Sequence, residues 1–166
     1  VFRSMDKGLS FGPAQNVSNT AAFSSKPKIA ASGASVYVAW VESVSSPASG
    51  SDIYFVSSSD SGLGYSASKN LSNTNGISTA VTLGADGLNV WMAWSDRVTG
   101  NDEISFVHSA DSGANFGLIL NLSNNTSKST DPSVIGKGNR VCLTWSDIPQ
   151  GDTKSDIFLV SSTDAG

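Results

Sequence analysis

The chain has 166 residues and a formal net charge of −4, and only 14% of its residues are charged. Because its few lysines and arginines form no basic stripe, the composition excludes a nucleic-acid partner. The single cysteine excludes an internal disulfide and a cysteine-based zinc site. No apolar run reaches membrane-spanning length, so membrane insertion is not expected. The abundance of Ser, Thr, Asn and Gly indicates an extracellular or cell-surface protein whose signal sequence lies outside this chain.

Three sequence marks recur in one phase. Ser-x-Asp-x-Gly occurs four times, with its aspartates spaced by 54, 51 and 53 residues. Trp40, Trp94 and Trp145 are spaced by 54 and 51 residues, and Asn-x-Ser-Asn begins at Asn16, Asn70 and Asn121. The chain is therefore a tandem repeat.

Each repeat predicts four short strands separated by Gly, Asn, Asp and Ser turns. In chain order, the strands are expected at residues 26–32, 36–40, 52–58 and 65–72, then at 78–84, 90–94, 103–109 and 116–123, and finally at 131–137, 141–145 and 156–162. Residues 26–72 and 78–123 form complete units, whereas residues 1–20 and 130–166 form partial ones. All four belong to a single module that spans residues 1–166.

The second strand of each repeat is apolar on both faces. In the first repeat, Val36, Val38 and Trp40 face one side, and Tyr37 and Ala39 face the other. A sheet with one solvated face would alternate apolar and polar residues. Four-stranded antiparallel units of about 50 residues that are buried on both faces are typical of β-propeller blades, so we expect an all-β propeller with about three blades per chain.

The repeated turn, with an aromatic residue three positions after its glycine, resembles the Asp-box (BNR-repeat) hairpin of sialidase-like β-propellers. The resemblance implies that the turn joins the third and fourth strands of each blade. A short Asp side chain can accept backbone N–H bonds, the glycine can adopt positive φ, and the aromatic ring can pack under the turn. The structural residues of the motif are Ser4, Asp6, Gly8, Phe11, Ser58, Asp60, Gly62, Tyr65, Ser109, Asp111, Gly113, Phe116, Ser162, Asp164 and Gly166.

The same resemblance raises the possibility of sialidase activity. Such enzymes hold a substrate carboxylate with three arginines, and they use a Tyr/Glu pair and an acid/base aspartate. Arg97 follows a second strand, Arg140 precedes one, and Arg3 lies just before a turn motif, so the three should not converge. The Arg-Ile-Pro element of that family is also absent. We therefore expect a non-catalytic scaffold for carbohydrate or protein binding, the alternative being a fragment of a sialidase-like glycoside hydrolase with its catalytic residues elsewhere.

The loops between second and third strands form the candidate binding face. An acid lies two residues after each repeated tryptophan, and a second acid lies just before each third strand. Three interpretations remain open: hairpin caps that accept backbone N–H bonds, calcium ligands, and carboxylate-pair hydrolysis. Recurrence in every repeat favours the first, so no cofactor or metal is expected. The candidate residues of this face are Glu42, Asp52, Asp96, Arg97, Asp102, Asp147, Gln150 and Asp156.

A second copy of the chain is the expected partner. The last repeat lacks a fourth strand, while residues 9–20 resemble a fourth strand without its blade. Two chains could exchange these pieces and form a six-bladed ring, because three blades are too few for closed propellers. The sequence thus predicts a homodimer.

Overall fold

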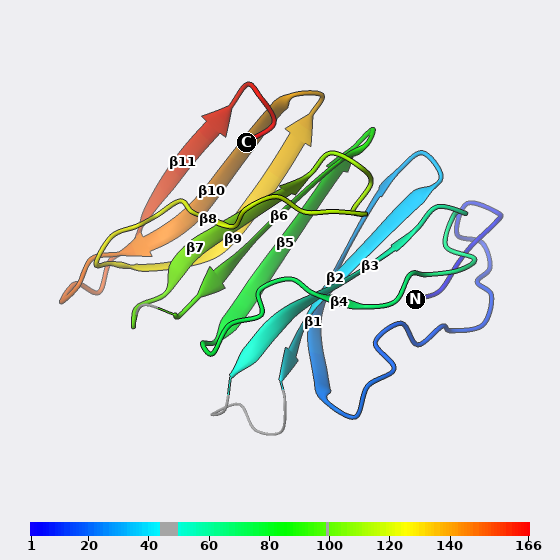
Figure 1. Cartoon of the computed structure of the whole chain (residues 1–166), viewed down its shortest axis with the longest axis horizontal. Helices are drawn as coiled ribbons and strands as arrows, with labels where there is room; N and C mark the ends of the chain where they lie inside the picture. The colour runs from blue at the N-terminus through cyan, green and yellow to red at the C-terminus, as the bar shows by residue number, and fades with distance from the viewer. Residues whose placement is uncertain (44–49, 99) are drawn as a thin grey trace.

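The computed structural model describes residues 1–43, 50–98 and 100–166, which fold into three antiparallel sheets (Figure 1). The first sheet contains β1 (Phe23–Ser32), β2 (Ser35–Ser43), β3 (Ser51–Ser58) and β4 (Lys69–Asn70), in that spatial order. The second contains β5 (Ser78–Asp86), β6 (Asn89–Asp96), β7 (Glu103–Ser109) and β8 (Leu120–Asn121). The third contains only β9 (Lys128–Lys137), β10 (Arg140–Ile148) and β11 (Asp156–Ser162). The described residues contain no helix that could cross a membrane.

The four-stranded antiparallel units predicted from the repeat are confirmed for the first two sheets, but two details differ. The fourth strands are only two residues long, Lys69–Asn70 and Leu120–Asn121, although Ser66, Leu71, Gly117 and Leu122 also donate backbone bonds to the third strands. Residues 1–22 form no strand, so the fourth strand expected within residues 9–20 is not formed. That segment instead folds back on itself through Gly12 N–Arg3 O and Gln15 N–Val1 O bonds of 2.9 and 2.8 Å.

The sheets stack face to face, and two apolar cores fill the spaces between them (Figure 1). Tyr37, Ala39 and Phe55 of the first sheet pack against Met92 and Trp94 of the second. The other face of the second sheet packs against the third through a core formed by Trp91, Ala93, Ile104, Phe106, Val134, Val141, Leu143 and Trp145. Both faces of β2 and β6 carry apolar residues because both faces are buried, as the sequence predicted.

A third, smaller core lies on the outer face of the first sheet. Val38, Trp40 and Val56 are covered there by the N-terminal segment, which contributes Val1 and Val17. The opposite end of the stack has no comparable cover among the described residues, and β11 is exposed from Asp156 to Ser161. The two ends of the stack therefore differ: one carries an added segment, and the other carries an open sheet face and edge.

The Ser-x-Asp-x-Gly turns have one hydrogen-bond pattern. In the second sheet, the Ser109 hydroxyl donates to Asp111 and accepts the Gly113 amide at 2.9 Å, while Asp111 accepts the Asn115 amide at 2.8 Å. Gly113 has a φ of +77°, and the residue before it, Ser112, also lies in the left-handed region at +59°. The predicted positive φ at the motif glycine is confirmed at all four turns.

The turn glycine is also an inter-sheet contact. A Cβ on Gly113 would lie 2.6 Å from the Phe55 ring of the preceding sheet, and the Phe116 ring meets Phe55 edge-on at a centroid distance of 5.1 Å. The aromatic residue therefore packs against the neighbouring sheet rather than only under its own turn, and it is half-buried at Tyr65 and Phe116. Phe11 contradicts the prediction of burial, since it is 62% exposed and no sheet of the described residues precedes it.

The replacement Gly113→Ala should destabilise the fold more than Gly8→Ala. Both glycines have positive φ, which costs about 1–2 kcal/mol for alanine, but only the Gly113 site is closed by an aromatic ring, whereas nothing lies within 4 Å of a Cβ at Gly8. Overpacking against Phe55 should add about 1–3 kcal/mol. Urea unfolding of the two variants measures the difference, and equal losses would contradict the inter-sheet role of Gly113.

Replacing Trp94 with alanine should reduce the free energy of unfolding by about 3–5 kcal/mol. The predicted burial of the repeated tryptophans is confirmed, because Trp40, Trp94 and Trp145 are 3%, 0% and 7% exposed. Chemical denaturation of Trp94→Ala tests the cost, with exposed Leu88→Ala as the control that should change little. A loss below about 1 kcal/mol would contradict the core position of Trp94.

Candidate ligand-binding face

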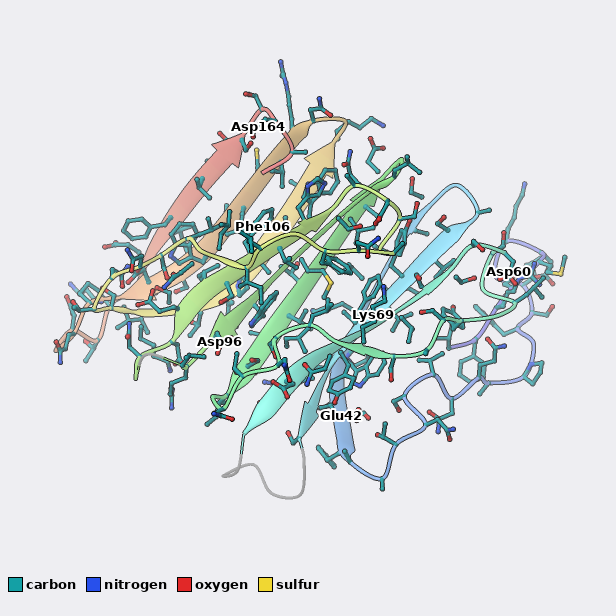
Figure 2. All side chains as sticks on the ribbon, viewed as in Figure 1. Glu42, Asp60, Lys69, Asp96, Phe106 and Asp164 are labelled. Carbon is teal, nitrogen blue, oxygen red and sulfur yellow. The ribbon has the colours of Figure 1, made fainter. Side chains whose placement is uncertain are left out.

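The repeated acids lie at one edge of the sheets because of strand register. The second and third strands pair so that Glu42 is opposite Asp52, Asp96 is opposite Glu103, and Asp147 is opposite Asp156. Figure 2 shows Glu42 and Asp96 at this edge, whereas Asp60 and Asp164 of the turn motifs lie toward the other end of the strands. In the second sheet the register places Glu103, rather than the predicted Asp102, at the position equivalent to Asp52 and Asp156.

The acids that follow the tryptophans are buried partners of the indole groups. Residues i and i+2 share a face of a strand, so each indole N–H reaches the carboxylate two positions later. The donor–acceptor distances are 2.7 Å for Trp40–Glu42, 3.0 Å for Trp94–Asp96 and 3.5 Å for Trp145–Asp147. A serine on the first strand of the same sheet also donates to each acid, namely Ser24, Ser78 and Ser129.

This arrangement corrects the expected hydrogen bonding of Glu42, Asp96 and Asp147. Their donors are mainly the side chains of tryptophan and serine, joined at Asp147 by Asn125, and not the predicted backbone N–H groups. The physical reason is that a buried indole must find an acceptor, and the residue two positions ahead offers it at no cost in chain rearrangement. The three acids are only 5%, 5% and 2% exposed, so they do not present carboxylates to a ligand.

The acids that begin the third strands hold the connection to the next sheet. Asp52 accepts hydrogen bonds from the side chains of Asn70 and Ser72, both at 2.8 Å, and from the Thr74 amide at 3.1 Å. Glu103 is bound in the same way by the Ser123 hydroxyl and the Asn125 amide. The serine of the Asn-x-Ser-Asn motif thus donates to the carboxylate and accepts the backbone amide of the residue that follows the acid. That residue is Ile53 in the first sheet and Ile104 in the second.

The asparagines of the same motif form turns. The side-chain oxygens of Asn16, Asn70 and Asn121 accept the amide three residues later at 3.1, 2.9 and 2.9 Å. Each turn ends at the residue that donates this amide, namely Asn19, Asn73 or Asn124, and these residues have left-handed φ values of 42°, 44° and 39°. The motif is therefore a structural signature of the segment that leaves the fourth strand.

Arg97 lies on the loop face, where a neighbouring carboxylate holds its side chain in place. Its Nε and Nη2 donate to the two carboxylate oxygens of Asp102 at 2.9 and 2.7 Å. The bond and the charge of Asp102 raise the pKa of Arg97 above its ordinary value. Asp102 is buried, while the Arg97 side chain remains 46% exposed, so Asp102 serves to orient the guanidinium rather than to contact solvent.

The predicted face thus separates into two groups. Arg97, Gln150 and Asp156 are exposed and Asp52 is half-exposed, whereas Glu42, Asp96, Asp102 and Asp147 are buried. Part of the loop between β2 and β3, residues 44–49, lies outside the described residues, as does Thr99. Within the described ranges, no group of three or more His, Cys, Asp or Glu side chains could hold a metal ion.

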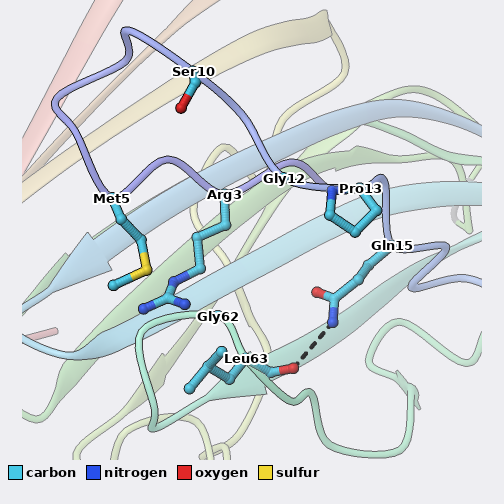
Figure 3. A pocket seen from close by; sticks show the side chains of 8 residues that line it. All are labelled: Arg3, Met5, Ser10, Gly12, Pro13, Gln15, Gly62 and Leu63. Carbon is cyan, nitrogen blue, oxygen red and sulfur yellow. Dashed lines mark hydrogen bonds between the residues drawn. The ribbon is translucent and has the colours of Figure 1, made fainter.

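The three arginines lie at separate places. Arg97 follows β6, whereas Arg140 begins β10 and so lies at the opposite end of the strands. Arg3 lines a cavity of about 300 Å³ between the N-terminal segment and the turn at Gly62 and Leu63 (Figure 3). Gln15 closes this cavity on one side by donating to the Leu63 carbonyl at 3.0 Å. No sequence pattern predicted this cavity, because it depends on how residues 1–20 pack.

Two equivalent buried acids differ in protonation behaviour. Burial raises the pKa of Asp96, and the nearby charge of Asp52 acts in the same direction. Burial alone would also raise the pKa of Asp147, but side-chain hydrogen bonds outweigh it, the largest from Asn125 at 2.7 Å, and the pKa is lowered. Asp96 lacks two of these donors, because Thr74 stands at the position of Asn125 and donates no such bond, and Gly76 stands at the position of Ser127.

The comparisons with known proteins concern the fold. The Trypanosoma rangeli sialidase in complex with the inhibitor DANA aligns with a TM-score of 0.64 and 12% identity, covering 87% of this chain and 30% of that one. Penicillium chrysogenum α-L-arabinanase complexed with arabinobiose aligns with a TM-score of 0.53 and 15% identity, covering 78% of this chain and 41% of that one. A family 117 glycoside hydrolase from the marine bacterium Zobellia galactanivorans aligns with a TM-score of 0.56 and 9% identity, covering 93% of this chain and 56% of that one. No protein-family model matches the sequence, and no curated protein matches it significantly.

These neighbours are β-propeller glycosidases, so the three sheets have the arrangement of sialidase-like propeller blades. We refer to them below as the first, second and third blades. The chain spans about 30–56% of the length of the three proteins named above. Within the described residues the blades form an open stack and not a closed ring.

Asp111→Asn and Asp96→Asn should show opposite pH dependence of stability. Hydrogen bonds from the Asn115 backbone and side chain lower the pKa of Asp111 to about 2, so its contribution is present above the unfolded pKa near 3.8 and is lost as the pH falls toward about 2. The pKa of Asp96 is raised; its contribution is present below the unfolded pKa and is lost as the pH rises through the folded pKa.

The measurement is urea unfolding of the wild type and both variants between pH 2 and pH 7. Relative to the wild type, Asp111→Asn should become less stable as the pH rises, and Asp96→Asn should become more stable. Slopes of the same sign for the two variants would contradict the assignment of these environments.

Proposed function

We propose that the chain is a non-catalytic, extracellular β-propeller scaffold with Asp-box hairpins, which binds a carbohydrate or protein ligand on the face that carries the second-to-third-strand loops. This face lies at the edge where strand register gathers the recurring acids. In related folds the same architecture carries catalytic sites. Whether this chain is a scaffold or an enzyme therefore depends on which groups the side chains at this edge bind.

The observation that supports the proposal is that these acids accept hydrogen bonds from groups within the scaffold. Glycoside hydrolysis needs two carboxyl groups that can reach the bond to be cleaved. Glu42, Asp96 and Asp147 are buried and bonded to indole and hydroxyl groups of their own blades. Glu103 is also buried, and it holds the segment that leads to the third blade. These carboxylates stabilise the scaffold and are not positioned for acid/base work on a sugar.

The ligand contacts are proposed to centre on Arg97. Only two of its N–H groups are engaged by Asp102, and the pair holds the guanidinium in one orientation. Such a preorganised donor group suits hydroxyl, carboxylate or carbonyl oxygens of a ligand. Gln150 and Asp156 offer further exposed polar groups on the corresponding loop of the third blade. Their polarity favours a hydrogen-bonding ligand over an apolar one.

A second candidate function is supported by the structural neighbours. All three named above are glycoside hydrolases, and this chain covers only part of each. A piece of such an enzyme would share the fold and lack the catalytic groups found on other blades. Hydrolytic activity of the chain together with its flanking sequence would favour this candidate over the binding scaffold.

The proposed ligand face is tested by glycan-array binding and calorimetry with Arg97→Ala and Arg140→Ala. Both arginines are exposed, but they lie at opposite ends of the strands, which makes Arg140→Ala a matched control. Arg97→Ala should weaken binding about tenfold or more, the value of one charged hydrogen bond, while Arg140→Ala should not. Equal effects of both variants would contradict the assignment of the face, and turnover of aryl sialosides or aryl arabinosides would contradict the non-catalytic role.

A further inference from the structure

A polar pocket of about 380 Å³ lies at the turn-motif end of the first blade. Residues 57–60 and 64–66 form most of its lining, together with Ser35 at the start of β2 and Ser112 from the turn motif of the second blade. The volume falls within the roughly 300–1,000 Å³ of small-ligand pockets. Figure 2 shows Asp60 at the end of the strands opposite to Glu42 and Asp96, so the pocket is separate from the loop face.

One carboxylate oxygen of this pocket has no partner among the described residues. Asp60 Oδ1 accepts the Ser58 hydroxyl at 2.7 Å and the amides of Leu63 and Gly64, both at 3.0 Å. Asp60 Oδ2 accepts no hydrogen bond from the part of the chain that the structure describes. The carboxylate thus stabilises the turn with one oxygen and leaves the other available.

The residue four positions after the aspartate accounts for this free oxygen. In the second blade, Asn115 donates to Asp111 Oδ2 at 2.8 Å, and the Ser10 hydroxyl makes the same bond in the N-terminal motif. Gly64 holds this position in the first blade and lines the pocket. A Cβ on Gly64 would lie 3.4 Å from Asp60 Oδ2, so the missing side chain leaves that oxygen open to the pocket.

Two further positions of the lining are also smaller in the first blade than in the second. Ser35 and Ser57 correspond by strand register to Asn89 and His108. In the second blade, the side chains of Asn89 and His108 bond to each other at 2.8 Å, and Asn89 also donates to the Gly138 carbonyl. The shorter serine side chains make no such bonds. The first blade therefore has a polar space where the second has larger side chains that bond within the protein.

We propose that this pocket binds a neutral sugar ring through Asp60 Oδ2 and the surrounding serine hydroxyls. Hydrogen bonds from the Gly64 backbone and the Ser58 side chain lower the pKa of Asp60, so the carboxylate is ionised at neutral pH. It can accept charge-assisted hydrogen bonds from ligand hydroxyls. Serine hydroxyls both donate and accept, and Tyr65 adds an aromatic ring to the lining.

The lining disfavours other classes of ligand. Its described residues include no basic side chain, so an anion would find no opposite charge. Calcium takes about six to eight oxygen ligands, usually from several carboxylates, and only one carboxylate lines this pocket. A sugar ring presents several hydroxyls close together, which suits one ionised acceptor among groups that donate and accept. The site is distinct from the proposed ligand face at Arg97 and does not depend on it.

Saturation-transfer NMR and isothermal titration calorimetry of the full chain test the site, with the methyl glycosides of glucose, galactose, mannose and fucose as probes. At least one glycoside should bind the wild type. Gly64→Asn should weaken this binding about tenfold or more, because the new side chain would bond to Asp60 Oδ2 as Asn115 bonds to Asp111. Gly64 has no left-handed φ, so this variant should remain folded, which circular dichroism establishes.

A second variant and a matched control separate the pocket from general surface effects. Ser57→Ala should weaken binding about two- to tenfold, the contribution of one neutral hydrogen bond. Gly117→Asn introduces the same side chain as Gly64→Asn at an exposed glycine of the second blade. Gly117 also lacks a left-handed φ and does not line the pocket, so binding should not change.

Three outcomes would overturn the proposal. The first is that none of the four glycosides binds, and the second is that the wild type and Gly64→Asn bind with equal affinity. The third is a response of the Asp60 carboxylate signal to calcium chloride alone, which would identify a cation site. Binding that is lost in Arg97→Ala but retained in Gly64→Asn belongs to the second outcome, and it would assign the glycoside to the loop face.

Discussion

The bond between each repeated tryptophan and the acid two residues later is the interaction on which the stack depends. A propeller blade must bury both faces, and the indole ring provides the large apolar surface that fills the space between blades. Its N–H group would be left without a partner in that core if the same strand did not supply an acceptor. The carboxylate then binds a serine of the first strand, which fixes the register of these two strands next to the core.

The same bond explains how acids near the loop face can be occupied within the scaffold. Acids placed near the loop face of a propeller can serve either the substrate or the scaffold. In this chain they serve the scaffold, at Glu42, Asp96 and Asp147 through tryptophan and at Asp52 and Glu103 through the connecting segments. The repeats have also diverged: Asp147 accepts bonds from Asn125 and Ser127 that Asp96 lacks, and the two equivalent carboxylates have opposite pKa shifts.

The sequence predicted the blades because the pattern repeats in a fixed phase and because β2 and β6 are apolar on alternate faces. It could not predict which neighbour a side chain meets. The contact of Phe116 with Phe55 joins residues of different blades, and the order of blades in space is not part of a local pattern. The position of Glu103, by contrast, was readable from the sequence, because the strands expected at 52–58, 103–109 and 156–162 align Glu103 with Asp52 and Asp156, and all three sheets have the same register. The arginine-lined cavity at residues 3–15 depends on the packing of a segment with no strand of its own.

The linear arrangement of the blades has a consequence for how the molecule opens. Each core joins only two adjacent blades, so the total stability is approximately a sum of blade terms and interface terms between nearest neighbours. The second blade shares both cores, while the first and third share one each. Amide hydrogens of β6, enclosed on both sides, should therefore exchange only through the largest opening events, and those of β11 through fraying of a single terminal unit. The stack is in this sense a short cooperative chain whose protection is greatest at its centre.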